Sequence, residues 1–177
     1  MVAKKFQQNN RAYLFISGVS RKEVTAALVV LATILVGMSL PGRLTVSISD
    51  SLNKRVFFLT GYGGIKHGDY MVFKGEAEHI AFAKLDHAVD KIIKIVGCAP
   101  GETLTRNLKG EFYCNGVFLG QALQADSKGR PLPQFGFSGI VPADNYFMIG
   151  DNPRSFDSKY FGFIHADRML YKVLPIF

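Results

Sequence analysis

An uncharged apolar stretch near the N-terminus constrains this 177-residue chain more than any other feature. Residues 24–40 read VTAALVVLATILVGMSL, and Pro41-Gly42 follows directly. As an α-helix, these 17 residues would rise about 25 Å, which is the lower end of the length that crosses a bilayer. The stretch therefore predicts one N-terminal transmembrane helix. It divides the chain into a short basic segment (1–23), an anchor (24–40) and one large domain (41–177).

Charge is distributed unequally on the two sides of this stretch. The net charge is +7, and the first 23 residues contribute +4, because five basic side chains are opposed only by Glu23. A basic flank favours a cytoplasmic N-terminus, with residues 41–177 on the opposite side of the membrane. The remaining +3 is spread from Arg43 to Lys172 without a basic run, so we expect no nucleic-acid partner.

Two other interpretations of residues 24–40 stay open. Gly37-Met38-Ser39 is a small-x-small triplet, the kind of site at which a secretory signal peptide is cleaved. The preceding polar region is long, however, and the apolar run exceeds the usual signal-peptide core, which favours a retained anchor. A buried helix of a soluble protein would show a polar face, whereas the polar side chains here are only Thr25, Thr33 and Ser39.

Beyond residue 41 the sequence is typical of β-structure. Short runs rich in β-branched and aromatic residues, such as RVFFLT, KIIKIVG and EFYCNGVFLG, alternate with Gly, Asn, Asp and Pro. Pairs such as Asn115-Gly116 favour tight hairpin turns. The pattern predicts a mainly β domain built from antiparallel hairpins, with one helix expected over Glu76 to Val89.

Two short segments carry side chains suited to catalysis. In SISDSLNKRVFF, serines recur at positions 47, 49 and 51 and would point to one side of an extended strand. An edge strand with a polar face explains the same pattern without catalysis. In KIVGCAPGE, Lys94 lies among apolar residues, and burial would lower its pKa and let it act as a general base. Simple alternation would instead turn Lys94 toward water.

A third segment makes the order of these residues specific. GDNPRSFDSKYFGFI begins at Gly150, and ALQADSKGRPLPQF precedes it. The chain carries, in this order, a serine beyond an apolar anchor, a lysine six residues before Pro-Gly, and this segment. This arrangement resembles that of the type I signal peptidases, the S26-like Ser/Lys peptidases. The two stretches ALQADSKGRPLPQF and GDNPRSFDSKYFGFI resemble the TraF-type branch of this family, which processes proteins of conjugative-transfer systems. The resemblance covers residues 44–177 and implies a signal-peptidase-like antiparallel β-sheet, serine endopeptidase activity and no cofactor.

The resemblance also implies a role for each matching residue. Ser51 takes the place of the nucleophile and Lys94 that of the general base, a variant of the serine-protease triad. Ser49 takes the place of a hydroxyl that helps to bind the oxyanion, and Ser155 that of a serine that orients the lysine. Asp157 and Lys159 take the places of a supporting acid–base pair. In the TraF-type branch, an aspartate at the place of Asp157 has been linked to pilin maturation.

The sequence departs from the family pattern at four positions. Asn53 stands where proline is usual after the nucleophile, and Ile95 stands where arginine usually follows the base. Glu102 replaces an aspartate, and Lys159 replaces an arginine. None of these changes removes a catalytic group. The first leaves the placement of the nucleophile open, with Ser49 as the alternative.

Cysteine and histidine usage gives weaker signals. Cys98 and Cys114 fall on predicted neighbouring strands and would form a disulfide in an oxidising compartment, or remain free thiols. The histidines are scattered, and no metal-site spacing is found among residues such as Glu76, Glu78, His79 and His87. We therefore expect no metal.

Taken with the resemblance, these features predict a single-pass protein of the bacterial inner membrane with a periplasmic serine peptidase domain. Its expected partners are the lipid bilayer and a precursor protein, namely a propilin or another component of a conjugative-transfer system. A general type I signal peptidase, or a non-catalytic pilus-assembly factor that retains the fold, is the alternative. A self-cleaving Ser–Lys repressor would share a β domain, but the anchor and the missing helix-turn-helix pattern argue against it.

Overall fold

The computed structural model describes residues 20–39, 41–75 and 91–177. The helix expected over Glu76 to Val89 lies outside the described residues. The chain separates into two compact units, Met1–Gly42 and Arg43–Phe177. Every strand found in the described residues lies in the second unit.

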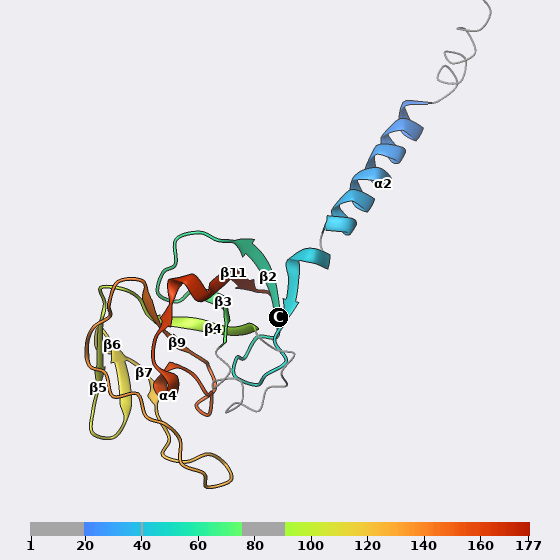
Figure 1. Cartoon of the computed structure of the whole chain (residues 1–177). Helices are drawn as coiled ribbons and strands as arrows, with labels where there is room; N and C mark the ends of the chain where they lie inside the picture. Colours follow the sequence, from blue (N-terminus) through green and yellow to red (C-terminus); the bar gives the residue numbers. More distant parts are fainter. Residues whose placement is uncertain (1–19, 40, 76–90) are drawn as a thin grey trace, which may run out of the picture. The chain divides into compact units, whose positions relative to one another are not determined.

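The first unit contains helix α2 (Arg21–Ser39), drawn in blue in Figure 1. A capping box begins it, since Glu23 N donates to Ser20 Oγ (3.3 Å) and Ser20 N donates to Glu23 Oε2 (2.7 Å). Residues 24–39 of the predicted membrane anchor are helical. Within the described parts of the chain, however, no helix is long and apolar enough to cross a membrane.

The second unit is built on a large antiparallel sheet with the strand order β1-β2-β11-β3-β4-β9-β10. A 3-10 turn η1 (Pro41–Arg43) leads into it. Its strands are β1 (Leu44–Val46), β2 (Val56–Gly61), β3 (Tyr70–Lys74), β4 (Lys91–Cys98), β9 (Asn145–Ile149), β10 (Ile164–His165) and β11 (Met169–Pro175). Strand β4 is therefore internal, between β3 and β9.

A smaller antiparallel sheet has the order β7-β6-β5-β8. It consists of β5 (Thr103–Arg106), β6 (Glu111–Cys114), β7 (Val117–Gln121) and β8 (Gly139–Ile140), and the short helices α4 (Ser158–Phe161) and η2 (Ala166–Arg168) lie later in the chain. The turn predicted at Asn115-Gly116 is confirmed, because Cys114 pairs directly with Val117. Both turn residues have positive φ (49° and 82°), as this two-residue hairpin requires.

Three apolar clusters hold the second unit together. One contains Met71 and Phe73, and another contains Val72 and Ile93, so both faces of the large sheet are covered at β3 and β4. The third joins the two sheets and includes Phe147 of β9 and residues of β5 and β6. A disulfide between Cys98 and Cys114 links the end of β4 to the end of β6. The predicted mainly β, antiparallel architecture is confirmed.

Candidate active site

The predicted nucleophile Ser51 lies on a loop that connects β1 to β2. The three alternating serines do not form the extended strand suggested by their spacing, because the chain bends through residues 49–53. Two contacts fix this bend: Leu52 is buried, at 4% exposure, in the cluster around Phe57, and Ser47 N donates to Arg55 O across the base of the loop. The bend brings Ser49 Oγ within 2.7 Å of Ser51 Oγ.

The predicted base Lys94 lies in the middle of β4 and is buried, at 3% exposure. Alternation along a strand exposes every second residue only where one face of the sheet is solvated. Here both faces are covered, so Lys94 is enclosed although its neighbour Ile93 is also buried. Lys94 Nζ donates a 2.6 Å hydrogen bond to Ser155 Oγ.

Burial lowers the pKa of Lys94 from 10.5 to about 8, because the ammonium loses its hydration. The carboxylate of Asp157 acts in the opposite direction, and the ammonium of Lys159 lowers the pKa further. At neutral pH roughly a tenth of the molecules then carry the free amine at Lys94. A buried amine of this kind can accept a proton under conditions in which an exposed lysine cannot.

The serines and the lysine open into one cleft of about 320 Å³. The loop after β1 contributes Ser49, Asp50 and Ser51, and β4 contributes Lys94. The remaining lining residues are Ile92 of β4 and, from the segment after β9, Asn152, Arg154, Ser155 and Phe156. The structure thus brings together four of the predicted site residues, with apolar side chains from Ile92 and Phe156 beside them.

Two residues that the sequence did not single out fasten the Ser51 loop to the segment after β9. Asn152 N donates to Ser51 O (3.2 Å), and Asn152 Nδ2 donates to Asp50 O (3.0 Å). Asp151 Oδ2 accepts a hydrogen bond from the backbone N–H of Asn53 (3.1 Å). Proline, the usual family residue at position 53, could not donate this bond. Asn53, which replaces the usual proline, therefore makes a backbone hydrogen bond to Asp151 that proline could not make.

Gly150 allows these two segments to approach each other closely. A Cβ atom at this position would lie 2.3 Å from Ser155 Oγ and 2.5 Å from Ser51 O, well inside van der Waals contact. The backbone of Gly150 thus lies between the serine that contacts Lys94 and the predicted nucleophile. Its N–H donates to Asp157 Oδ2 (3.0 Å).

Asp157 and Lys159 do not line the cleft but form a buried ion pair behind it. Both are almost fully enclosed, at 0% and 1% exposure, and Lys159 Nζ lies 2.6 Å from Asp157 Oδ2. Asp157 also caps α4 by accepting from Lys159 N (3.2 Å). The Lys159 side chain runs past Gly120 of β7, where an added Cβ would meet it at 3.6 Å. The pair therefore connects Gly150 to the smaller sheet.

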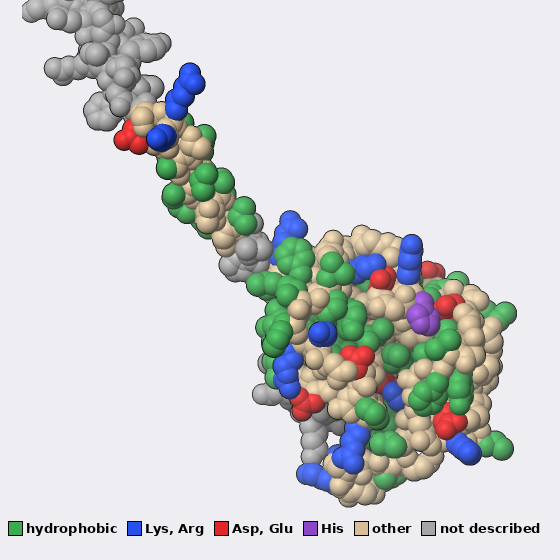
Figure 2. All heavy atoms as spheres, turned by 180° about the vertical axis from the view of Figure 1, so that it is seen from behind, with side chains coloured by type: hydrophobic (Ala, Val, Ile, Leu, Met, Phe, Trp, Pro, Cys, Tyr) green, Lys and Arg blue, Asp and Glu red, His purple; other side chains and the backbone are tan. Residues whose placement is uncertain are grey.

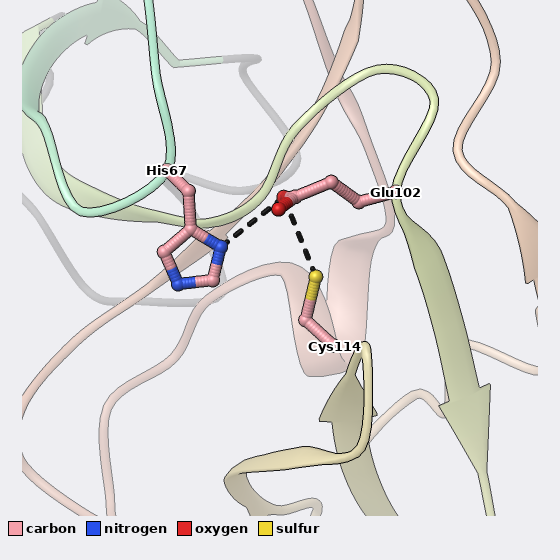
Figure 3. A group of neighbouring side chains, drawn as sticks. All are labelled: His67, Glu102 and Cys114. Carbon is pink, nitrogen blue, oxygen red and sulfur yellow. Dashed lines mark hydrogen bonds and ion pairs between the residues drawn. The ribbon is translucent and has the colours of Figure 1, made fainter.

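The structure also gathers side chains that sequence spacing did not connect. His67, Glu102 and Cys114 come from three separate segments and meet at one point (Figure 3). The acids and histidines considered from the sequence, Glu76, Glu78, His79 and His87, lie outside the described residues.

Comparison with known protein families identifies the chain. The model of the family described as signal peptidase, peptidase S26, matches residues 19–177. A comparison with curated proteins finds no match. Because the family match covers most of the chain, the protein belongs to the signal peptidase family, peptidase S26. It is therefore a serine peptidase, a hydrolase whose substrate is a precursor protein.

Proposed function

We propose that the protein cleaves its precursor with a catalytic dyad of Ser51 and Lys94. The observation that carries this proposal is the position of a buried lysine with a lowered pKa in the same cleft as Ser51. A serine hydroxyl is a weak nucleophile unless a base removes its proton. Lys94 is the buried base in the cleft, whereas the carboxylate of Asp50 is exposed and pairs with Arg55 (2.7 Å). Ser155 holds the amine through the 2.6 Å hydrogen bond to Nζ.

The reaction then proceeds in two stages, acylation and deacylation, and in each stage Lys94 first accepts a proton and then returns one. Ser51 Oγ attacks the carbonyl carbon of the scissile bond while its proton moves to the neutral Lys94 Nζ. When the C–N bond breaks, Lys94 returns that proton to the leaving amine, and an ester remains on Ser51. Lys94 then takes a proton from water, the resulting hydroxide attacks the ester, and the new C-terminal acid leaves as Ser51 regains its proton.

The oxyanion of each tetrahedral intermediate is bound by the backbone N–H of Ser51 and the hydroxyl of Ser49. This role is supported by the 2.7 Å distance between the two serine oxygens, which places the Ser49 hydroxyl beside the reacting atom. One such donor contributes about 2.7–4 kcal/mol to transition-state stabilisation in other enzymes. The same proximity makes Ser49 the alternative nucleophile.

Single-turnover cleavage of a precursor tests the dyad. Ser51→Ala and Lys94→Ala should each lower the rate on the order of 10³-fold or more, and the double variant should be no slower than either single variant. Lys91→Ala is the matched control, because Lys91 lies on the same strand but is exposed. Full activity in Ser51→Ala together with loss of activity in Ser49→Ala would move the nucleophile to Ser49.

The proposed substrate is a propilin or another exported component of a conjugative-transfer system. The proposal is supported by the likeness of residues 122–135 and 150–164 to the TraF-type branch. A general signal peptidase is the alternative in the same family. Mass spectra of a candidate propilin and of an ordinary secretory preprotein, each produced with the wild type and with Ser51→Ala, distinguish the two. Shortening of both substrates would favour the general enzyme, and shortening of neither would favour a non-catalytic assembly factor.

The proposed location is the bacterial inner membrane, with the catalytic unit on the periplasmic side. Two features support it: the basic segment before residues 24–40, and the Cys98–Cys114 disulfide, which is typical of an oxidising compartment. A reporter that is active only outside the cytoplasm, fused after Phe177, should be active. Activity of a reporter that works only in the cytoplasm would overturn this orientation.

Contact with lipid is supported by an apolar row on the large sheet. Leu44 of β1 and Leu174 of β11 both pair with Phe58 of β2, so the three side chains share one face. Leu44 and Leu174 are 45% and 52% exposed. Figure 2 shows hydrophobic side chains gathered in patches on one face of this unit, with Lys and Arg scattered between them. Charged substitutions at Leu44 and Leu174 should reduce binding of residues 43–177 to lipid vesicles.

A further inference from the structure

His67, Glu102 and Cys114 bring three metal-binding atoms together where the two sheets meet. His67 comes from the loop between β2 and β3, Glu102 from the turn between β4 and β5, and Cys114 from the end of β6. Figure 3 shows the three side chains pointing toward one another. Glu102 Oε2 lies 3.1 Å from His67 Nδ1 and 3.4 Å from Cys114 Sγ, and all three ligand atoms lie within 4.8 Å of one another.

Two of these separations are close to the edges of a tetrahedral zinc site. Zinc binds nitrogen, oxygen and sulfur at about 2.0–2.3 Å, so two ligand atoms of a tetrahedral site lie about 3.3–3.8 Å apart. The two shorter separations are already close to this range before any ion enters. The combination of imidazole, carboxylate and thiolate is also one that zinc prefers.

The cluster lacks a thiolate ligand, because Cys114 is bonded to Cys98 in this structure. A disulfide sulfur carries no proton and no negative charge, so it does not serve as a thiolate ligand. Two-electron reduction by a thiol or phosphine would release two thiols at this point. Cys98 Sγ, which is bonded to Cys114 Sγ in this structure, would then supply a fourth ligand.

Hydrogen bonds from neighbouring groups hold the Glu102 carboxylate in place and leave the site open to solvent. Glu102 Oε2 accepts from Ala99 N (2.6 Å), and Oε1 accepts from Asn115 Nδ2 (3.2 Å). Such contacts orient ligands and are a regular part of metal sites in proteins. The His67 and Glu102 side chains are 44% and 24% exposed, whereas both cysteines are fully buried. An ion can therefore enter from the side of His67.

We propose that reduction of the Cys98–Cys114 disulfide converts this junction into a zinc site formed by His67, Glu102, Cys114 and Cys98. Two reductant thiols donate their hydrogens to the cysteine sulfurs and join as their own disulfide, or a phosphine takes the oxygen of a water molecule, becomes its oxide and leaves the two water protons on the sulfurs. Zn²⁺ then displaces the two thiol protons. The bound ion replaces the covalent link between the ends of β4 and β6. This site is distinct from the cleft and does not depend on the proposed peptidase mechanism.

A cobalt titration of Cys98→Ser tests the site without a reductant, because this variant leaves Cys114 permanently free. Co²⁺ bound to a thiolate gives a charge-transfer band, and tetrahedral Co²⁺ gives intense visible bands. We expect one equivalent of Co²⁺ to produce both signals and Zn²⁺ to displace it. Adding His67→Ala should weaken binding at least about tenfold. His165→Ala is the matched control, since His165 is an exposed histidine 2.9 Å from a carboxylate, that of Asp167, and should leave binding unchanged.

The wild-type protein provides a second test through its redox state. Oxidised protein should give no thiolate–cobalt band, whereas protein reduced with a phosphine should bind one Zn²⁺ and melt at a higher temperature with zinc than without it. Absence of the charge-transfer band in Cys98→Ser, equal cobalt binding after His67→Ala, or equal zinc binding by the oxidised and reduced proteins would each overturn the proposal.

Discussion

Lys94 Nζ donates to Ser155 Oγ across 2.6 Å, and both side chains are only 3% exposed. The partner of the buried ammonium is thus a neutral hydroxyl, which orients the amine without compensating its charge. A carboxylate in the same place would stabilise the protonated form and raise the pKa. The hydroxyl instead leaves burial as the dominant effect, which explains why the pKa of Lys94 falls to about 8.

The first prediction concerns the pH dependence of cleavage. Lys94 must be neutral to accept the proton of Ser51, so kcat/KM should rise with pH and level off above the Lys94 pKa of about 8. Initial rates of precursor cleavage between neutral and alkaline pH measure this. A rate that is flat or falls over this range would exclude Lys94 as the base.

The second prediction concerns the cost of burying the same charge. In the unfolded chain Lys94 stays protonated to about pH 10.5, and in the folded protein only to about pH 8. Between these values the unfolded chain binds more protons, so this residue makes the folded state more stable as the pH rises. Lys94→Met removes the buried charge and should raise the free energy of unfolding at neutral pH by about 1–3 kcal/mol.

Urea unfolding at neutral pH and at about pH 10 checks this expectation, because the gain should shrink as the pH approaches the unfolded-state pKa. Lys91→Met is the control, since exposed Lys91 on the same strand should change stability by no more than about 0.5 kcal/mol. A loss of stability in Lys94→Met at neutral pH would contradict the argument.

The burial of Lys94 could not be predicted from the local sequence pattern alone. The order of Ser51, Lys94 and Ser155 was sufficient to suggest the site, because the resemblance supplied their roles. Alternation within KIIKIVG, in contrast, predicts an exposed lysine. That interpretation was wrong because β4 is an internal strand covered on both faces. A strand's position within a sheet depends on pairings between distant segments, which local periodicity does not contain.

Other features of the structure show the same difference between local features, which the sequence predicts, and contacts between distant segments, which it does not. The Asn115-Gly116 turn was predictable because its positive φ angles are a local requirement of the two residues. The meeting of His67, Glu102 and Cys114 was not, since the three residues lie on separate loops and strands. The contacts of Asp151 and Asn152 with the Ser51 loop likewise join segments about 100 residues apart.

The third prediction separates orientation from structural support. Ser155→Ala removes one hydrogen bond to Lys94, so it should lower kcat strongly while stability changes by only about 0.5–1.5 kcal/mol. Asp157→Ala leaves the buried ammonium of Lys159 without its partner and should cost about 3–5 kcal/mol of stability as well as activity. Thermal melts and single-turnover assays on both variants measure the difference. Wild-type cleavage by Ser155→Ala would show that this serine does not position the lysine.

The fourth prediction concerns the close approach at Gly150. In Gly150→Ala, the new methyl group would overlap Ser155 Oγ and Ser51 O, so both segments must shift. We expect a loss of about 1–3 kcal/mol in stability and a large fall in kcat. Gly136→Ala is the control, because an added Cβ there meets no atom within 4 Å. Equal activity of the two variants would show that the site tolerates movement of this segment.

The last prediction assigns two separable effects to Asp151. Its carboxylate accepts a hydrogen bond from Asn53 N (3.1 Å), and its charge raises the pKa of Lys94. Asp151→Asn removes the charge but retains an oxygen that can accept the bond. This variant should therefore shift the pH profile of kcat/KM to lower pH while its alkaline plateau stays near the wild-type value.

Asp151→Ala removes both the charge and the acceptor, so its profile should shift in the same direction and its plateau should also fall. We expect the plateau to fall about tenfold, because a small displacement of the nucleophile already costs much of the rate. Asn53→Pro removes the donor instead of the acceptor. It should lower the plateau without moving the profile, provided circular dichroism shows that the variant is folded. A plateau that falls equally in Asp151→Asn and Asp151→Ala would show that the charge of Asp151, and not its hydrogen bond to the Ser51 loop, is what the reaction requires.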